Sequence, residues 1–475
     1  MRQIYGEYKP DQPPHLQDGL QTADGVVPIA NGYAPIPQFS AAVNGALGGT
    51  CLGAAAYRTN GENFVFAATA GKIRRYTSTG YTDLKTGMFS TAAIGVRFCP
   101  YASFMLATNG VDAVQKFDPT SPSSFTDLDA SAPTARFLAV VRGFVVAGYA
   151  DDDSLRVAWS DNGDPTEWTP GTLEAGLYQM PSGGDITGLV GGEYGLVFQE
   201  NRVLRMTYTA DDTIWQFDEI ATDVGCIAPW SLATYGKITF FLSTKGLMAC
   251  DGISVEAIGS EKVDREFLSV LDRTYIENMS AVVDPTRSLY IVAQPSANPT
   301  NRAFIYHYGL QRWTTAQIGQ QRMFSALAAG ASLEDLDAIY GNLDLIPISL
   351  DSAAFRGGYP VMMLFDAASA LGALSGTPMG ANLVDARREL VPGRKSRITS
   401  VRPLGDMPSS TLSLSMSDSL SEDGTSTDYT DRTAGGFYRM RQSANFSQVS
   451  LSIAAGVSWS YVQGYDIEAF PGGRA

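Results

Sequence analysis

The chain has 475 residues, of which 44% are apolar and 17% are charged, and this balance excludes an intrinsically disordered protein. It is longer than one ordinary hydrophobic core supports, but it is within the size of a large repeat fold. Its formal net charge of −15 argues against charge-driven wrapping of nucleic acid, which needs a surface rich in Lys and Arg. The 48 glycines and 24 prolines favour many turns and short strands over long helices.

The cysteines and histidines do not form a metal-binding pattern. The cysteines are Cys51, Cys99, Cys226 and Cys250. None of them belongs to a CxxC pair, and the two histidines, His15 and His307, are far apart, so a zinc site is not expected. Each cysteine has apolar neighbours, so we expect four buried free thiols and assembly in a reducing compartment.

Residues 1–45 are expected to form an extended N-terminal arm. Prolines rule out a long helix there because each fixes φ and removes a backbone donor. They are Pro10, Pro13, Pro14, Pro28, Pro35 and Pro37. Such an arm needs a partner surface, either the chain's own body or a neighbouring subunit. The N-terminus lacks the apolar core of a signal peptide, and no apolar run approaches the ~20 residues that cross a bilayer. We therefore expect a soluble chain without a membrane span, made in a cytoplasm.

Residues 188–208 contain the unit around which the chain is organised. Two short apolar stretches are joined by the polar turn Gln199-Glu200-Asn201, which is typical of a β-hairpin. Related units recur at intervals of roughly 40–50 residues, with four short strands each and an aromatic residue in the third strand of most units. These aromatic residues are Tyr76, Phe117, Trp159, Tyr208 and Tyr306. The period predicts an all-β fold, with a β-propeller of six or seven blades over residues 46–390.

Several details of this interpretation follow from local patterns. In the third unit, the fourth strand is placed at EWTP, residues 167–170. Helical spacing of apolar residues predicts short helical inserts at 263–271 and 331–345. The stretches PISLDS and VMMLFD that follow are interpreted as strands that could form a last blade. Alternating strands over residues 391–475 predict a β-sandwich-like C-terminal module. Phe117, Trp159, Tyr208 and Trp313 are expected to be buried between sheets.

The order of segments along nearly the whole chain resembles that of a known family. The segments include GVVPIANGYAPIPQF (25–39), VAWSDNGDPTEWTPG (157–171), GCIAPWSLATYG (225–236), IYHYGLQRWTTA (305–316) and SWSYVQGYDIEAFPGGR (458–474). Together they resemble the β-propeller tail proteins of tailed bacteriophages, the group of packaged-DNA stabilisation and nozzle proteins. None is a chemical signature, so the resemblance depends on their number and order.

The resemblance implies a structural subunit of the virion tail, assembled in the host cytoplasm. Such subunits usually form a homo-hexameric ring that lines or closes the channel for genome retention and ejection. The implied partners are an adaptor or connector ring above, and tail fibre, spike or needle proteins. Phage DNA would pass through the lumen without sequence-specific binding. The acidic balance fits this, because carboxylates around a lumen repel DNA phosphates.

Two acidic stretches are candidate sites with simpler alternatives. Asp151-Asp152-Asp153 places three carboxylates in a loop that could hold calcium, but no EF-hand pattern is present and a solvated hairpin loop is favoured. Residues 160–168 resemble a single Asp-box turn of the sialidase type. That box repeats in several blades of its own family, so a blade turn with Trp168 packed between sheets is favoured.

No motif indicates catalysis: the chain has no GxSxG elbow, HExxH pair or Walker loop. We therefore expect no catalytic, cofactor or metal site and a protein that is not an enzyme. Glu334 and Asp335 are attributed to the start of a helix. One basic cluster stands out, and it could contact nucleic acid or an acidic subunit, or form the solvated face of a linker. It comprises Arg387, Arg388, Arg394, Lys395 and Arg397. The rival function is a propeller that binds or cleaves receptor glycans, which for cleavage would need two carboxylates facing each other across a pocket.

Overall fold

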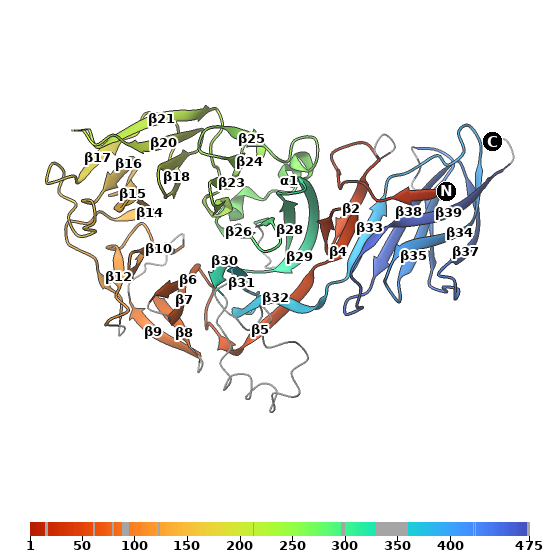
Figure 1. Ribbon diagram of the computed structural model, residues 1–475, viewed down its shortest axis with the longest axis horizontal. Helices are drawn as coiled ribbons and strands as arrows, with labels where there is room; N and C mark the ends of the chain where they lie inside the picture. The colour runs from red at the N-terminus through yellow and green to blue at the C-terminus, as the bar shows by residue number, and fades with distance from the viewer. Residues whose placement is uncertain are drawn as a thin grey trace.

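The computed structural model describes residues 1–472 apart from 15–17, 60–61, 78–79, 88–94, 122–123, 212, 296–299, 328–359, 421 and 423. Four-stranded units stand around a ring, and a β module of two sheets extends from one side of it (Figure 1). Within the described residues the ring has seven such units, so the predicted all-β propeller is confirmed with seven blades. No helix in these residues is long and apolar enough to cross a membrane.

The first four blades follow the chain in order. Blade 1 contains β6 (Gly53–Thr59), β7 (Glu62–Thr69), β8 (Lys72–Thr77) and β9 (Gly80–Thr86). Blade 2 contains β10 (Arg97–Tyr101), β11 (Phe104–Thr108), β12 (Gln115–Phe117) and β13 (Thr126–Asp127). Blade 3 contains β14 (Ala135–Val141), β15 (Phe144–Ala150), β16 (Asp153–Trp159) and β17 (Gly176–Gln179). Blade 4 contains β18 (Ile186–Val190), β19 (Gly195–Gln199), β20 (Arg202–Tyr208) and β21 (Trp215–Thr222).

The remaining blades include one strand from the N-terminal segment. Blade 5 contains β22 (Ala233–Tyr235), β23 (Ile238–Ser243), β24 (Gly246–Cys250) and β25 (Val255–Ala257). Blade 6 contains β26 (Ser280–Asp284), β27 (Leu289–Ala293), β28 (Thr300–His307) and β29 (Arg312–Gly319). Blade 7 contains β30 (Arg322–Leu327), β31 (Pro360–Phe365), β32 (Ala370–Pro378) and β5 (Pro37–Ala46).

Apolar cores between neighbouring blades hold the ring together. Between blades 1 and 2, Phe66 and Phe117 meet edge to face with ring centroids 5.0 Å apart. The ring closes because Ala67 of blade 1 shares a core with Phe324 and Phe365 of blade 7. Each blade therefore buries its sheet against the neighbouring blades, which is how a propeller removes its apolar surface from water.

The last strand of blade 7 comes from the other end of the chain. β5 pairs antiparallel with β32, and Ser40 lies opposite Ala373. At Gly372 the two backbones approach closely, since a Cβ there would lie 2.2 Å from the carbonyl oxygen of Ser40. The sequence interpretation placed a last blade near VMMLFD, which is β31, but it did not find the strand that completes this blade.

The β module also takes strands from both ends of the chain. One sheet has the order β3 (Val26–Ile29), β4 (Gly32–Pro35), β39 (Val462–Pro471), β34 (Ser396–Gly405) and β37 (Tyr438–Ala444), with β1 (Arg2–Ile4) also paired to β39. The other continues blade 6 outward from β29 through β2 (Leu20–Asp24), β33 (Ala381–Asp385), β38 (Phe446–Ile453), β35 (Thr411–Ser417) and β36 (Thr425–Tyr429). A single nine-stranded sheet therefore joins propeller and module.

This pairing corrects the predicted domain boundaries. Residues 1–45 are not a separate arm, because their strands belong to the module and to blade 7. The module begins before residue 391, because β33 already pairs with β2 and β38. Of the two partner surfaces considered for the N-terminal segment, the chain's own body is the one observed.

Other sequence-based details have mixed outcomes. Phe117, Trp159 and Trp313 are buried as predicted, whereas Tyr208 is only half-buried and donates a hydrogen bond to Glu174. All four cysteines are buried free thiols, as predicted. The helix predicted over 263–271 is present as α1 (Asp264–Ser269), while 331–345 and PISLDS lie outside the described residues. The strand placed at 167–170 is wrong: these residues lie in the loop between β16 and β17, and the fourth strand is β17.

The N-terminal segment also holds α1 in place. The Asp11 carboxylate accepts hydrogen bonds from the backbone N–H groups of Arg265 and Glu266, 2.8 and 2.9 Å away. These N–H groups at the start of a helix have no partner within it, so Asp11 acts as a cap from a distant part of the chain. Tyr8 donates to Glu266 over 2.7 Å, and Arg302 of blade 6 forms an ion pair with the same carboxylate.

Asp264, the first residue of α1, is a buried carboxylic acid. It is 8% exposed, and its Oδ1 accepts a 2.9 Å hydrogen bond from the backbone N–H of Leu247. Burial, with a smaller contribution from the charge of Asp11, raises the pKa of Asp264 from 3.8 to about 6. Its ionisation therefore opposes folding at neutral pH.

The first prediction concerns the closing strand. Gly372→Ala should lower the free energy of unfolding by about 1–3 kcal/mol, because the added methyl group collides with the β5 backbone and the ring of Phe39. Gly71→Ala is the matched control, because a Cβ there meets no atom within 4 Å. Chemical denaturation measures both. Equal stability of the two variants would contradict the closing role of β5.

The second prediction concerns pH. The folded pKa of Asp264 lies above its unfolded value, so stability should fall as pH rises from about 4 to about 6. Asp264→Asn keeps an oxygen acceptor for Leu247 and should remove this decline, which makes the variant more stable at pH 7 by on the order of 2 kcal/mol. Thermal unfolding across pH 4–8 measures the effect, with exposed Asp152→Asn as control. If the stability of Asp264→Asn falls with pH as much as that of the unchanged protein, Asp264 is not the cause of the decline.

Candidate functional site at the mouth of the propeller channel

The innermost strands of the propeller enclose a cavity. Its volume is about 440 Å³, and it is bounded by β6, β22, β26 and β30. Small side chains line much of it, including Ala56, Ala233, Ala281 and Ser325. Because these strands belong to blades 1, 5, 6 and 7, the cavity lies inside the ring.

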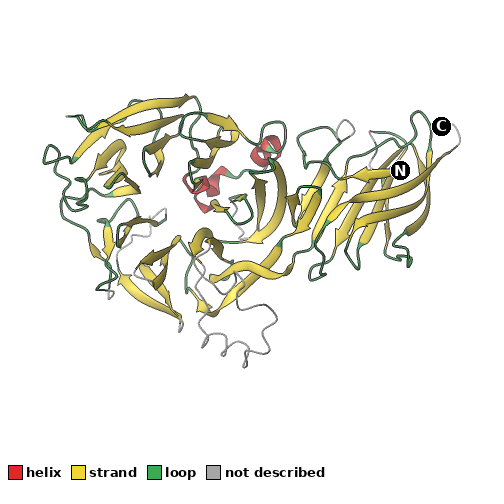
Figure 2. Cartoon of the chain, viewed as in Figure 1, coloured by secondary structure: helices red, strands yellow, loops and turns green. Residues whose placement is uncertain are grey.

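Charged and aromatic residues from distant parts of the chain meet where the innermost strands begin. Arg97 opens β10 and Arg322 opens β30, while Trp230 lies in the helical turn η1 (Pro229–Ser231) and Glu277 in η2 (Arg273–Asn278). Figure 2 draws short helical segments in red inside the ring. The guanidinium carbons of Arg97 and Arg322 each lie 4.0 Å from the centre of the Trp230 ring. We call this group the Trp230 cluster.

Local backbone geometry positions the indole ring. Pro229 is at the start of η1, where its missing N–H costs no hydrogen bond. Gly95 has φ of +144°, and a Cβ there would lie 2.5 Å from Cζ2 of Trp230. The ring can therefore lie directly on the backbone that leads into β10.

Arg322 is the most constrained member of the cluster. It is 4% exposed, and its guanidinium donates to the backbone oxygens of Met279 at 2.8 Å and Glu277 at 2.7 Å. Burial lowers the pKa of Arg322 to about 10, so the side chain stays protonated at neutral pH. The blade 7 arginine thus fastens η2 to the mouth of the channel.

A small pocket of about 40 Å³ opens beside the Trp230 cluster. Arg97, Arg136, Asn109, Trp230 and Glu277 are among the residues that line it. Burial lowers the pKa of Arg97 to about 10 and raises the pKa of Glu277, although the nearby arginines oppose the latter shift. Arginine charge therefore exceeds carboxylate charge in this lining, although the whole protein is acidic.

These residues were not identified from the sequence, although a repeated signal marks three of them. Arg97 precedes Phe98 and Arg136 precedes Phe137, in each case at the start of an innermost strand. Arg322 stands two residues before Phe324 at the equivalent place in blade 7. Comparing the first residues of aligned blades would have shown the arginines. The contributions of Trp230 and Glu277 depend on how the connecting turns fold back.

Asp151 and Asp152 form the turn between β15 and β16, and Asp153 begins β16. Arg156 of β16 pairs with Asp151 at 3.3 Å and with Asp153 at 3.5 Å, so a neighbouring cation already balances part of the acidic charge. No group of three or more potential metal-ligating His, Cys, Asp or Glu side chains occurs in the part of the chain that the structure describes. The geometry therefore fits the hairpin loop that was favoured from the sequence.

The stretch from Ser160 to Trp168 folds as the turn that was favoured over an Asp-box site. Trp168 is 4% exposed, and its indole N–H donates to the carbonyl oxygen of Pro165 over 2.7 Å. It packs in a core that contains Cys99 of blade 2 and Val145 of blade 3. Trp168 thus fills the space between two blades, as predicted.

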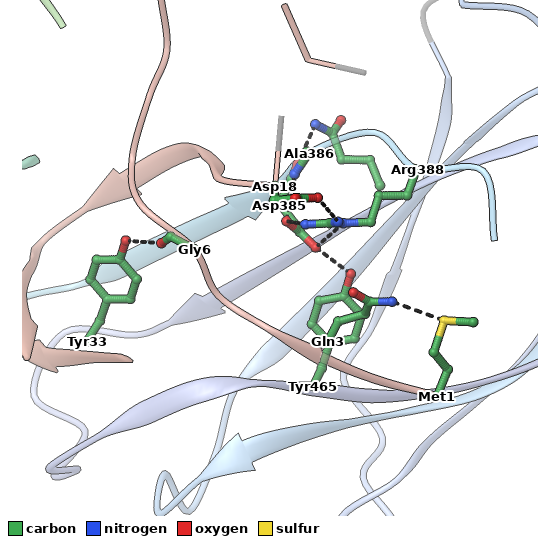
Figure 3. A network of polar contacts seen from close by, with 10 residues as sticks. Met1, Gln3, Gly6, Asp18, Tyr33, Asp385, Ala386, Arg388 and Tyr465 are labelled. Atoms are coloured by element: carbon green, nitrogen blue, oxygen red, sulfur yellow. Dashed lines mark hydrogen bonds and ion pairs between the residues drawn. The ribbon is translucent and has the colours of Figure 1, made fainter. Parts of the chain in front are cut away.

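The basic cluster at residues 387–397 is mostly satisfied within the chain. Arg388 binds Asp385, which is 1% exposed and also accepts a 2.6 Å hydrogen bond from Tyr465 (Figure 3). Arg388 reaches Asp18 as well, and Lys395 pairs with Asp418 at 2.6 Å. Arg387 donates to the backbone oxygens of Leu420 and Glu422. Arg394 and Arg397 are exposed, so only part of the cluster faces solvent.

The other candidates are structural or lie outside the described residues. His307 accepts a hydrogen bond from the backbone N–H of Leu310, and burial lowers its pKa. His15, Glu334 and Asp335 lie outside the described residues. Among the described residues that line the cavity and the pocket inside the ring, Glu277 is the carboxylate, so they do not supply the facing pair that a glycosidase needs.

Comparisons with known proteins return propellers of diverse kinds. No family model matches the chain, and no curated protein matches its sequence. The WD40 domain of Pan2 from Neurospora crassa is similar at 9% identity over 70% of this chain and 91% of that one, with a TM-score of 0.39. BamB from Moraxella catarrhalis is similar at 10% identity over 74% and 92%, with a TM-score of 0.39. These values carry no inference about function.

Proposed function

We propose that this chain is a structural subunit of a bacteriophage tail, where a homo-hexameric ring lines or closes the genome channel. The series of segments that resembles phage tail propellers supports the proposal across nearly the whole sequence. In this proposal the protein is not an enzyme, and it resides in the virion tail after assembly in the host cytoplasm. An adaptor or connector ring lies above it, and fibre, spike or needle proteins are its other partners.

The observation that carries the proposal is the nine-stranded sheet that joins propeller and module. β2 pairs with β29 of blade 6 on one side and with β33 of the module on the other. The Thr315 hydroxyl reinforces the junction by donating to Asp24 over 2.8 Å. Two units that share one sheet resist bending relative to each other, which suits a component that must hold its shape under the pressure of a packaged genome.

The channel mouth bears on where the genome would pass. Trp230 and its two arginines lie at the mouth of the propeller's own channel, and the cavity inside the ring of blades is only about 440 Å³. In this proposal the genome does not pass through a single propeller. A conduit formed between several subunits would provide the path for the DNA duplex.

Exposed carboxylates supply a surface that suits such a conduit. Asp129, Asp151, Asp152 and Asp164 are exposed on loops of blades 2 and 3. Hydrogen bonds from Thr166 lower the pKa of Asp164, and the negative charge of Asp129 opposes this shift, so at least these two carboxylates lie close enough to interact. If these loops face the lumen, their charge repels DNA phosphates and the genome slides without specific binding.

The third prediction concerns assembly. Like charges that converge in a ring repel one another, and salt screens this repulsion over ~8–10 Å. The isolated protein should therefore be mostly monomeric at low salt and should form increasing amounts of a six-membered ring as ionic strength rises. Sedimentation velocity over a salt and concentration series measures this, with negative-stain imaging of the associated fraction.

A variant of the full-length chain with Asp151 and Asp152 changed to Asn tests whether these carboxylates cause the repulsion. If these loops face the lumen, the variant should associate at lower salt than the unchanged protein. A single monomeric species under all conditions, or rings that form best at low salt, would contradict the proposal. Deleting residues 1–45 is not a usable test, because those residues complete blade 7 and the module.

A further inference from the structure

Two arginines that line the small pocket, Arg97 and Arg136, each hold the guanidinium group over an aromatic ring. The Arg97 guanidinium stacks on Trp230 at 4.0 Å and on Phe137 at 4.8 Å. The Arg136 guanidinium stacks on Tyr149 at 3.9 Å. Among the described residues neither guanidinium has a hydrogen-bond acceptor. Stacking leaves the N–H fork of an arginine available for an oxyanion.

Both groups line the same pocket, and its size limits what can enter. The pocket measures about 40 Å³. A cavity needs roughly 10–15 Å³ on this measure to hold one water molecule, so there is space for about three water-sized groups. A carboxylate group has three heavy atoms, whereas a phosphate has five. The space therefore fits a carboxylate better than a phosphate.

The charge of the pocket also favours an added anion. Arg97 and Arg136 line the pocket with one carboxylate, Glu277, and Arg322 stands behind Trp230. Glu277 forms no ion pair within 4.0 Å with the described residues, so it partly neutralises the arginines from a distance. An entering carboxylate could accept charge-assisted hydrogen bonds that Glu277 does not make.

We propose that this pocket binds a carboxylate group, held by the N–H groups of Arg97 and Arg136 beside the indole of Trp230. The ligand is either a small free carboxylate or a Glu or Asp side chain of a protein segment that enters the channel mouth. The chemistry is the same in both cases, and the source is distinguished by the probes. The proposal does not depend on the phage tail assignment.

Acetate and the blocked tripeptide Ala-Glu-Ala serve as probes, with inorganic phosphate as a third arm and chloride at equal ionic strength as the baseline. Binding is measured by isothermal titration calorimetry on the full-length protein and by the concentration-dependent rise of the thermal unfolding midpoint. We expect acetate or the peptide to bind, and the tighter of the two identifies the source.

Three variants make this fourth prediction specific. Arg136→Gln should weaken binding by about tenfold or more, whereas Glu277→Gln should tighten it, because it removes the competing carboxylate. Arg142→Gln is the matched control: Arg142 also stacks on an aromatic ring, that of Tyr208 at 5.2 Å, and does not line the pocket. Arg142→Gln should leave binding unchanged. Arg97→Gln should also weaken binding, and if it disrupts folding, the three variants above still decide the question.

The proposal is overturned if neither carboxylate probe raises the unfolding midpoint above the chloride baseline. It is also overturned if phosphate alone binds, or if Arg136→Gln and Arg142→Gln reduce binding equally. Failure of these measurements leaves the phage tail proposal untouched, because ring assembly is measured without any carboxylate probe.

Discussion

Main-chain hydrogen bonding between the N-terminal strands and sheets formed hundreds of residues later is the constraint on which this structure depends. β5 completes blade 7, and β2 joins blade 6 to the module. Without them, β32, β29 and β33 would each present an unpaired edge to water or to other chains. Bringing such distant segments together costs chain entropy, which the buried apolar faces of Leu20, Ile36 and Tyr33 help to offset. The ring, the module and their fixed connection all follow from this pairing.

Buried charge is handled differently in the module and at the channel mouth. In the module, Asp385 is matched by Arg388 and Tyr465, so the buried carboxylate is satisfied within the chain. Such a network is costly to break, because removing one partner leaves an unpaired charge in a low-dielectric environment. At the channel mouth, Arg97 and Arg136 stack on aromatic rings without a carboxylate partner among the described residues. The first arrangement stabilises the fold, while the second leaves binding capacity at the mouth.

The sequence was most informative where contacts are local. Short apolar runs with Gly or Asn turns identified β19 and β20, and the apolar spacing over 263–271 identified α1. It was least informative where partners are distant. No local pattern near residues 37–46 predicts that they pair with β32. Trp230 contacts Arg97 and Arg322 only after the ring closes. EWTP was mistaken for a strand because it closes the third unit with an aromatic residue, as the last segments of other units do, although Trp168 packs from a loop. Local periodicity predicts elements, whereas chain closure and site assembly depend on topology.

Native-state hydrogen exchange, followed by mass spectrometry across a denaturant series, tests most directly whether the N-terminal strands hold the structure together. If they do, amides in 20–24 and 37–46 should open with the same free energy as those of β27, the fully buried strand at Leu289–Ala293, because all would exchange through global unfolding. Exchange of 20–24 and 37–46 through a much smaller opening free energy, while β27 stays protected, would show that the propeller and module stand without them and would contradict this interpretation.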